Sequence, residues 1–169
     1  TKTSPVNIAA AVPFVLGEVS VGNDHPVLAV LQTAIDPVDP LNHALAMAAA
    51  PLAPGLAKQV FQPFAQGDTY SPVRTQLAYL FAAGFSAVKA PANVTMPDAD
   101  LVDLKPLAPP AGGNLRDGAR AITALVREYA PPPGTDGHFV SFRDTDGKRD
   151  VDHFLADVLE STDAPKIGR

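Results

Sequence analysis

The chain contains no cysteine, which excludes disulfide bonds and zinc sites that use cysteine ligands. It also lacks any run of Lys and Arg, and its net charge of -5 argues against nucleic acid or anionic lipid as a partner. Its longest apolar stretch, residues 6–17, contains Pro13 and is shorter than the roughly 20 residues of a membrane-spanning helix. The expected partner is therefore a small molecule or another protein.

The start of the chain lacks an initiator Met and the pattern of a signal peptide. We interpret Thr1 as the first residue of a processed or shortened product, which favours a secreted or cell-envelope location. A free N-terminal threonine can act as a nucleophile, but chains of that kind begin with a strand. Here Thr1 precedes Pro5 and an expected helix, so this reading is disfavoured.

Residues 1–55 are rich in Ala, Leu and Pro and predict short helices. Pro26 stands at a first helical position, and apolar residues follow it at helical spacing until Asp36 and Pro37. A second short helix is expected from Pro40 to Ala49, with Asp39 as its cap. Small helices joined by prolines cover apolar surface without forming a sheet, so this segment is predicted to be a cap or lid.

Residues 56–169 predict a different organisation, in which strands alternate with helices. Residues 58–65 (KQVFQPFA) favour a strand, followed by the Gly67-Asp68 turn. Ser71 as N-cap and Pro72 as first helical residue then predict a helix that ends at Gly84. The apolar residues expected to face inward on this helix are Val73, Leu77, Leu80 and Phe81.

The same unit recurs after an irregular stretch from Pro91 to Gly118. Residues 123–129 (TALVREY) predict a strand, a turn follows at Gly137 and His138, and a last helix is expected to start at Asp150. Its predicted apolar stripe consists of Val151, Phe154, Leu155, Val158 and Leu159. Two strand-turn-helix units with reactive residues after the strands indicate an α/β fold with a mostly parallel sheet and flanking helices.

The turn at Asp68 and the later Gly137-His138-Phe139-Val140 turn resemble the acid and histidine segments of the α/β-hydrolase family, in particular bacterial lipases and esterases. The resemblance covers roughly residues 56–160. It implies that Asp68 orients the imidazole of His138, which accepts the proton of a serine nucleophile. The predicted fold is the C-terminal part of an α/β-hydrolase, and the predicted activity is hydrolysis of hydrophobic carboxylic esters without a cofactor or a metal.

The serine segment of that family is missing, because none of the serines lies in a Gly-x-Ser-x-Gly motif. Our hypothesis is a two-chain hydrolase, in which an N-terminal fragment of the same precursor supplies the serine and the oxyanion donors. Two alternatives remain open. The same triad can serve a peptidase or amidase, and a non-catalytic binding module can keep the fold without the chemistry.

Other candidate groups have simpler explanations. Residues 144–147 (DTDG), with Asp150 and Asp152, resemble a calcium loop, but Gly is in the fourth position instead of the sixth and Lys148 takes the place of a ligand. His25, His43 and His153 lack the spacing of metal ligands. Asp68 and His138 can themselves be ordinary turn residues, and only their matching positions after two strands favour a catalytic role.

Overall fold

A three-stranded parallel sheet forms the centre of the computed structural model, which describes residues 25–92, 94, 105–160 and 163–169 together with the single positions 13 and 17. Its strands are β1 (Val60–Ala65), β2 (Ser86–Val88) and β5 (Ala124–Tyr129), in the order β1-β5-β2. Both predicted strands are confirmed. Every residue of β5 is buried, as expected for a central parallel strand that is covered on both faces.

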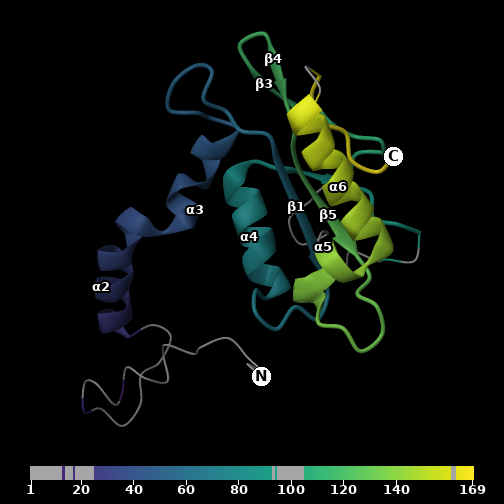
Figure 1. The fold of residues 1–169 in the computed structure, drawn as a ribbon. Coiled ribbons are helices and arrows are strands. Elements are labelled where there is room, and N and C mark those ends of the chain that lie inside the picture. Colours follow the sequence, from purple (N-terminus) through teal and green to yellow (C-terminus); the bar gives the residue numbers. More distant parts are fainter. Residues whose placement is uncertain (1–12, 14–16, 18–24, 93, 95–104, 161–162) are drawn as a thin grey trace.

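Helices cover both faces of this sheet (Figure 1). On one face, α4 (Val73–Ala83) packs its Leu77 and Leu80 against Ala124 and Val126 of β5. On the other face, Leu125 and Tyr129 of β5 belong to clusters that include residues of α5 (Val140–Arg143) and α6 (Thr145–Glu160). Alternate residues of β5 thus pack against the helices on opposite faces of the sheet. The predicted class, α/β with a parallel sheet and flanking helices, is confirmed.

The connection between β2 and β5 carries an antiparallel hairpin of β3 (Leu115–Asp117) and β4 (Arg120–Ile122). Its Asp117 accepts hydrogen bonds from the main-chain N–H groups of Gly55 and Ala57 at 2.9 and 3.0 Å. The hairpin therefore fixes the chain just before β1. The predicted irregular stretch from Pro91 to Gly118 includes β3, the first strand of this hairpin. Residues 93 and 95–104 of that stretch lie outside the described residues.

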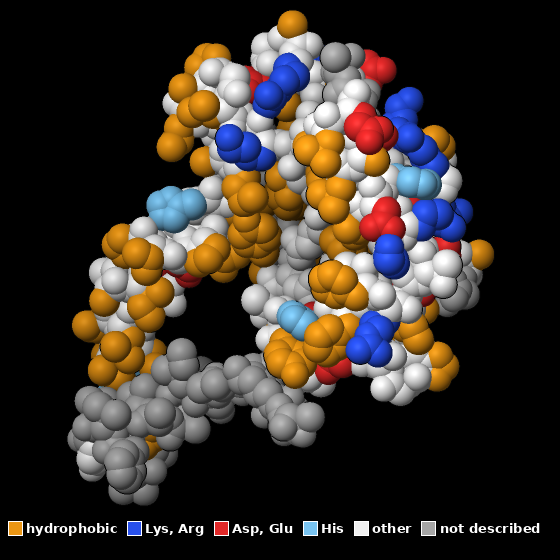
Figure 2. Space-filling model, viewed as in Figure 1, with side chains coloured by type: hydrophobic (Ala, Val, Ile, Leu, Met, Phe, Trp, Pro, Cys, Tyr) orange, Lys and Arg blue, Asp and Glu red, His pale blue; other side chains and the backbone are white. Residues whose placement is uncertain are grey.

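The part of the predicted cap that the structure describes, from residue 25 on, contains α2 (Pro26–Ile35), η1 (Asp36–Val38), α3 (Pro40–His43) and η2 (Ala44–Met47), and most of residues 1–24 lie outside the described residues. Asp39 caps α3 as predicted, because its carboxylate accepts the N–H of Leu41. No residue of α2 is buried, and Val38 is 75% exposed. Among the described residues of the cap, those that join the core are Ala44 and Ala48 near its end, which pack in the cluster of α4. Figures 1 and 2 show α2 standing away from the sheet with apolar side chains on its surface.

The predicted boundaries and inward faces of two helices are wrong in detail. The N-cap of α4 is Pro72 and not Ser71, and no side chain caps this helix. Phe81, expected to face inward, is 65% exposed. Gly84 ends the helix as predicted, in the left-handed conformation with φ 68°.

The last helix begins one and a half turns earlier than predicted. It starts at Thr145, where the carboxylate of Asp144 accepts the N–H of Gly147 at 2.7 Å. Asp150, predicted as the cap, lies inside α6 and is fully buried against Arg127. Of the predicted stripe, Val151 and Phe154 are half-buried, whereas Leu155, Val158 and Leu159 are exposed. None of the helices in the described ranges is long and apolar enough to span a membrane.

Candidate functional site

The acid turn follows directly after β1. Its Asp68 accepts hydrogen bonds through Oδ1 from the N–H groups of Tyr70 and Ser71, at 2.8 and 2.7 Å. This is the local turn bonding for which aspartate is favoured, so Asp68 has a structural role whatever else it does. Its side chain is only 6% exposed. The turn therefore fixes one carboxylate oxygen and leaves Oδ2 for other partners.

The histidine turn follows β5 and contains η4 (Gly137–Phe139). It lies against the acid turn so closely that only glycine fits at 137. A Cβ there would approach the carbonyl oxygen of Gln66 to 2.4 Å and the amide nitrogen of Asp68 to 2.8 Å. Parallel neighbouring strands end at the same edge of a sheet, which is why two turns so far apart in sequence meet here.

The structure brings the two predicted site residues together. His138 Nδ1 lies 3.4 Å from Asp68 Oδ2, although 70 positions separate the two residues in the sequence. The distance is long for an N–H···O hydrogen bond, and catalytic hydrogen bonds of this kind are often long in free proteins. The His138 side chain is 41% exposed. The geometry assigns Nδ1 to the acid, so Nε2, on the other side of the ring, is the nitrogen available for proton transfer.

Two aromatic rings flank the imidazole. The Tyr70 ring lies 4.6 Å from the His138 ring at an interplanar angle of 34°, and Phe139 meets His138 edge-on at 5.2 Å. Tyr70 and Phe139 are themselves exposed. Sequence reasoning assigned no role to either residue, although Tyr70 follows Asp68 by two positions and Phe139 belongs to the turn that contains His138. Two partly exposed aromatic rings thus lie directly against the imidazole.

A second carboxylate, Asp136, was also missed by sequence reasoning. It accepts the Thr69 hydroxyl at 2.6 Å and the N–H of His138 at 2.9 Å. These hydrogen bonds, with the one from the Thr69 side chain the largest, lower the pKa of Asp136. Asp136 therefore stays ionised and connects the acid turn to the histidine turn. Its position as N-cap of η4, two residues before His138, is the signal that identifies it.

A cavity of about 520 Å³ lies between α3 and α4, next to the acid turn. Its apolar wall includes Pro40, Leu41 and the Tyr79 ring, and its polar residues are Asp39, Gln62, Ser71, Thr75 and Gln76. The volume lies in the range of roughly 300–1,000 Å³ that is usual for small-molecule sites. Gln76 connects the cavity to the candidate site, because its amide donates to Asp68 Oδ2 at 3.0 Å.

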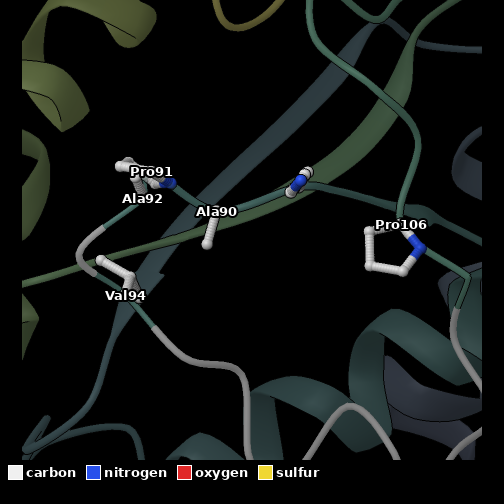
Figure 3. A pocket seen from close by; sticks show the side chains of 6 residues that line it. Ala90, Pro91, Ala92, Val94 and Pro106 are labelled. Carbon is white, nitrogen blue, oxygen red and sulfur yellow. The ribbon is translucent and has the colours of Figure 1, made fainter.

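A smaller cavity of about 240 Å³ lies beyond the end of β2 (Figure 3). Its lining consists of Lys89, Ala90, Pro91, Ala92, Val94 and Pro106. Its described lining shares no residue with the candidate site, and the one titratable side chain in that lining is Lys89. We assign it no chemistry.

The remaining predicted candidates have other positions. In the described part of the chain, no group of three or more His, Asp or Glu side chains is arranged to hold a metal ion. The Asp144 side chain bonds to the start of α6, and His43 Nε2 lies 2.9 Å from the carbonyl oxygen of Pro37. Among the described residues, no serine hydroxyl is hydrogen-bonded to His138, so a nucleophile is not part of this arrangement.

Comparison with known proteins gives no relative: no family model, no curated protein and no solved structure matches the chain. The chemistry of the site therefore depends on its geometry. An ionisable acid held against one imidazole nitrogen, with the ring partly exposed, can orient a base and stabilise its protonated form. Proton transfer to or from a group at Nε2 is the reaction that this arrangement supports.

Proposed function

We propose that the chain carries the acid and the histidine of a serine-dependent carboxylic ester hydrolase of the α/β-hydrolase type. The observation that carries the proposal is the position of Asp68 beside His138, each on the turn after one of two adjacent parallel strands. The order along the chain, acid before histidine, is that of the α/β-hydrolases. Asp68 is the orienting acid and His138 is the general base.

In the proposed reaction, His138 Nε2 takes the proton of a serine hydroxyl while the serine oxygen attacks the ester carbonyl. The imidazolium is stabilised by Asp68 and then gives its proton to the departing alcohol, which leaves an acyl-enzyme. Water, deprotonated at Nε2, releases the acid. Backbone N–H groups that hold the carbonyl oxygen in its anionic form complete the mechanism. These groups and the serine come from a companion N-terminal fragment.

The edge of the sheet supports a companion of this kind. The N–H of Val60 donates to Thr123 at 2.7 Å, so the main-chain groups of alternate residues, Phe61 and Pro63, point away from β5. Within the described residues no strand pairs with β1 on that side. Pro63 has no N–H to leave unpaired there, as is usual in an edge strand. A strand of the companion can pair through the Phe61 N–H and the carbonyl groups.

The surroundings of the site support a hydrophobic ester as the substrate. The rings of Tyr70 and Phe139 flank the imidazole, and the 520 Å³ cavity has an apolar wall formed by α3 and α4. Asp39 also lines this cavity, and its negative charge disfavours an anionic ligand. An uncharged ester with an apolar acyl group fits both features.

The test is ester turnover by the native preparation that contains this chain. His138→Ala removes the general base, and we expect kcat for a p-nitrophenyl ester to fall by about a thousandfold or more. His43→Ala is the matched control, because His43 is not among the residues that line the cavity and its Nε2 lies 2.9 Å from the carbonyl oxygen of Pro37. Equal turnover in both variants would contradict the proposal. Turnover of a matched anilide at the same rate would instead identify an amidase.

A further inference from the structure

Gln76, on α4, is a second side chain besides His138 that contacts the candidate acid Asp68. It lies in the first turn of α4, where its own N–H bonds to the carbonyl oxygen of Pro72 at 3.1 Å. Its Nε2 donates to Asp68 Oδ2 at 3.0 Å and to the carbonyl oxygen of Ser71 at 2.6 Å. The same oxygen, Oδ2, faces the imidazole. Gln76 and His138 therefore share one atom of Asp68.

The hydrogen bonds of Asp68 divide into two sets. The turn holds Oδ1 through two main-chain N–H groups, and Gln76 holds Oδ2 through a side-chain amide. An ionised carboxylate oxygen can accept more than one hydrogen bond, so the bond from Gln76 does not exclude the one from His138. With three donors besides the imidazole, the plane of the carboxylate is fixed. Oδ2 is then aimed at Nδ1 and not at solvent.

Gln76 is itself held in place. Both hydrogens of its amide are used by Asp68 and Ser71, and its Oε1 lies 3.4 Å from the Nε2 of Gln62 on β1. A site group supported by a helix and by further hydrogen bonds keeps its geometry better than one held by a loop alone. The Gln62–Gln76–Asp68 series thus connects the sheet and α4 to the histidine turn.

We propose that Gln76 is a positioning residue, which acts through Asp68 to keep the proton of neutral His138 on Nδ1. The inference rests on the proposed function, since this tautomer leaves Nε2 as the base. Gln76 bonds to Asp68 and not to the imidazole, so its effect on His138 passes through the carboxylate. It has no counterpart among the residues that the sequence singled out, because a glutamine eight positions after the acid forms no motif.

The test is the tautomer ratio of neutral His138, measured by long-range ¹H–¹⁵N correlation spectra of the full chain labelled with ¹⁵N-histidine. In the unsubstituted protein we expect the Nδ1–H form to predominate. Gln76→Met keeps the length of the side chain and removes both donors. We expect it to lower the ratio of Nδ1–H to Nε2–H by roughly threefold or more, because a carboxylate that is no longer held in its plane accepts the Nδ1–H hydrogen bond less well.

Two controls separate positioning from packing. Gln59→Met removes an amide of the same type that bonds to residues 121 and 123 at the other end of the strand, and we expect it to leave the ratio unchanged. Gln76→Leu is the second variant at the same position, in case Gln76→Met does not fold. It also lacks the donors and adds no charge beside Asp68, and we expect the same fall in ratio. An unchanged ratio in a folded variant of either kind would overturn the inference.

Measuring the tautomer ratio does not require a serine, so the role of Gln76 can be tested independently of the proposed function. A lowered ratio in a preparation without ester turnover would support Gln76 as a positioning residue and contradict the hydrolase. Ester turnover that depends on His138, with a ratio that does not respond to Gln76, would support the hydrolase and overturn the role of Gln76.

Discussion

Thr69 and Asp136 join the two turns of the candidate site through a hydrogen bond of 2.6 Å between the Thr69 hydroxyl and the Asp136 carboxylate. The same carboxylate accepts the N–H of His138, so a residue beside the acid is connected to the backbone of the base. The 3.4 Å approach of His138 to Asp68 therefore does not depend on that contact alone. Both turns are held by neighbouring groups that sequence reasoning did not select.

The lowered pKa of Asp136 predicts a pH-dependent contribution to stability. A carboxyl whose pKa is lower in the folded than in the unfolded chain stabilises the fold above its unfolded value of about 3.9. That contribution is lost as the pH falls through the folded value. We expect Asp136→Asn to destabilise the protein at neutral pH, with the difference from the unsubstituted protein shrinking in acid. Urea denaturation at a series of pH values measures it.

The control for this series is Asp117→Asn. Hydrogen bonds from Gly55 and Ala57 lower the pKa of Asp117, and the carboxylate is remote in sequence from the two turns. Asp117→Asn should also lower stability at neutral pH, with a difference that shrinks in acid. It should leave the tautomer of His138 unchanged. A difference between Asp136→Asn and the unsubstituted protein that stays constant from neutral pH into acid would contradict the assignment.

Gly137→Ala is predicted to disturb the site directly. The added methyl group would lie 2.4 Å from the carbonyl oxygen of Gln66 and 2.8 Å from the amide nitrogen of Asp68. Both are main-chain atoms, so neither can move away as the end of a flexible side chain could. We expect a loss of about 1–3 kcal/mol in the free energy of unfolding, together with a loss of His138-dependent turnover.

The control is Gly118→Ala, between β3 and β4 of the hairpin. Gly118 has φ 60° with nothing within 4 Å of an added Cβ, so an alanine there is strained by about 1–2 kcal/mol without a clash. Both variants should lower stability, but only Gly137→Ala should separate Asp68 from His138. Unchanged turnover in a folded Gly137→Ala protein would show that the close contact of the two turns has no role in the reaction.

A buried ion pair connects β5 to α6. Arg127 Nη1 lies 2.6 Å from Asp150 Oδ2, which also accepts the Tyr129 hydroxyl at 2.5 Å. Burial and the hydrogen bond to Asp150 raise the pKa of Tyr129 well above its usual value. Removing one partner leaves a buried charge without compensation, so Asp150→Ala should cost about 3–5 kcal/mol in the free energy of unfolding. Chemical denaturation measures this cost.

Tyr129→Phe tests the smaller part of the same network. It removes one hydrogen bond to a charged group and keeps the ion pair, so the expected cost is about 1.5–3 kcal/mol. If Asp150→Ala cost no more than the tyrosine variant, the ion pair would not be what holds α6 on the sheet.

Two of the three strands of the sheet, β1 and β5, and the meeting of Asp68 with His138 could be predicted from the sequence, whereas the three-residue strand β2 could not. Short apolar runs followed by glycine turns identify β1 and β5, and parallel neighbouring strands bring their ends together. Asp150 was misassigned for a physical reason. An aspartate before an apolar stripe is typical of a helix cap, and only the position of Arg127 on β5 shows that it is buried within the helix.

The supporting residues could not be predicted in the same way. Gln76, Thr69 and Asp136 act through contacts between elements that are distant in the sequence, and their residue types are common in turns and on helix surfaces. The exposure of Phe81 has a similar cause. Helical spacing gives the side of a helix on which a residue lies, but not how far the neighbouring layer extends over that side.

The most direct test of the proposed hydrolase is to treat the native, unfractionated preparation with a fluorophosphonate that labels activated serines and to measure the mass and N-terminal sequence of every labelled polypeptide. The account predicts label on a companion fragment that carries Gly-x-Ser-x-Gly and co-purifies with this chain, and no label when His138 is replaced by Ala. A preparation in which this chain is the sole polypeptide and takes no label would contradict it.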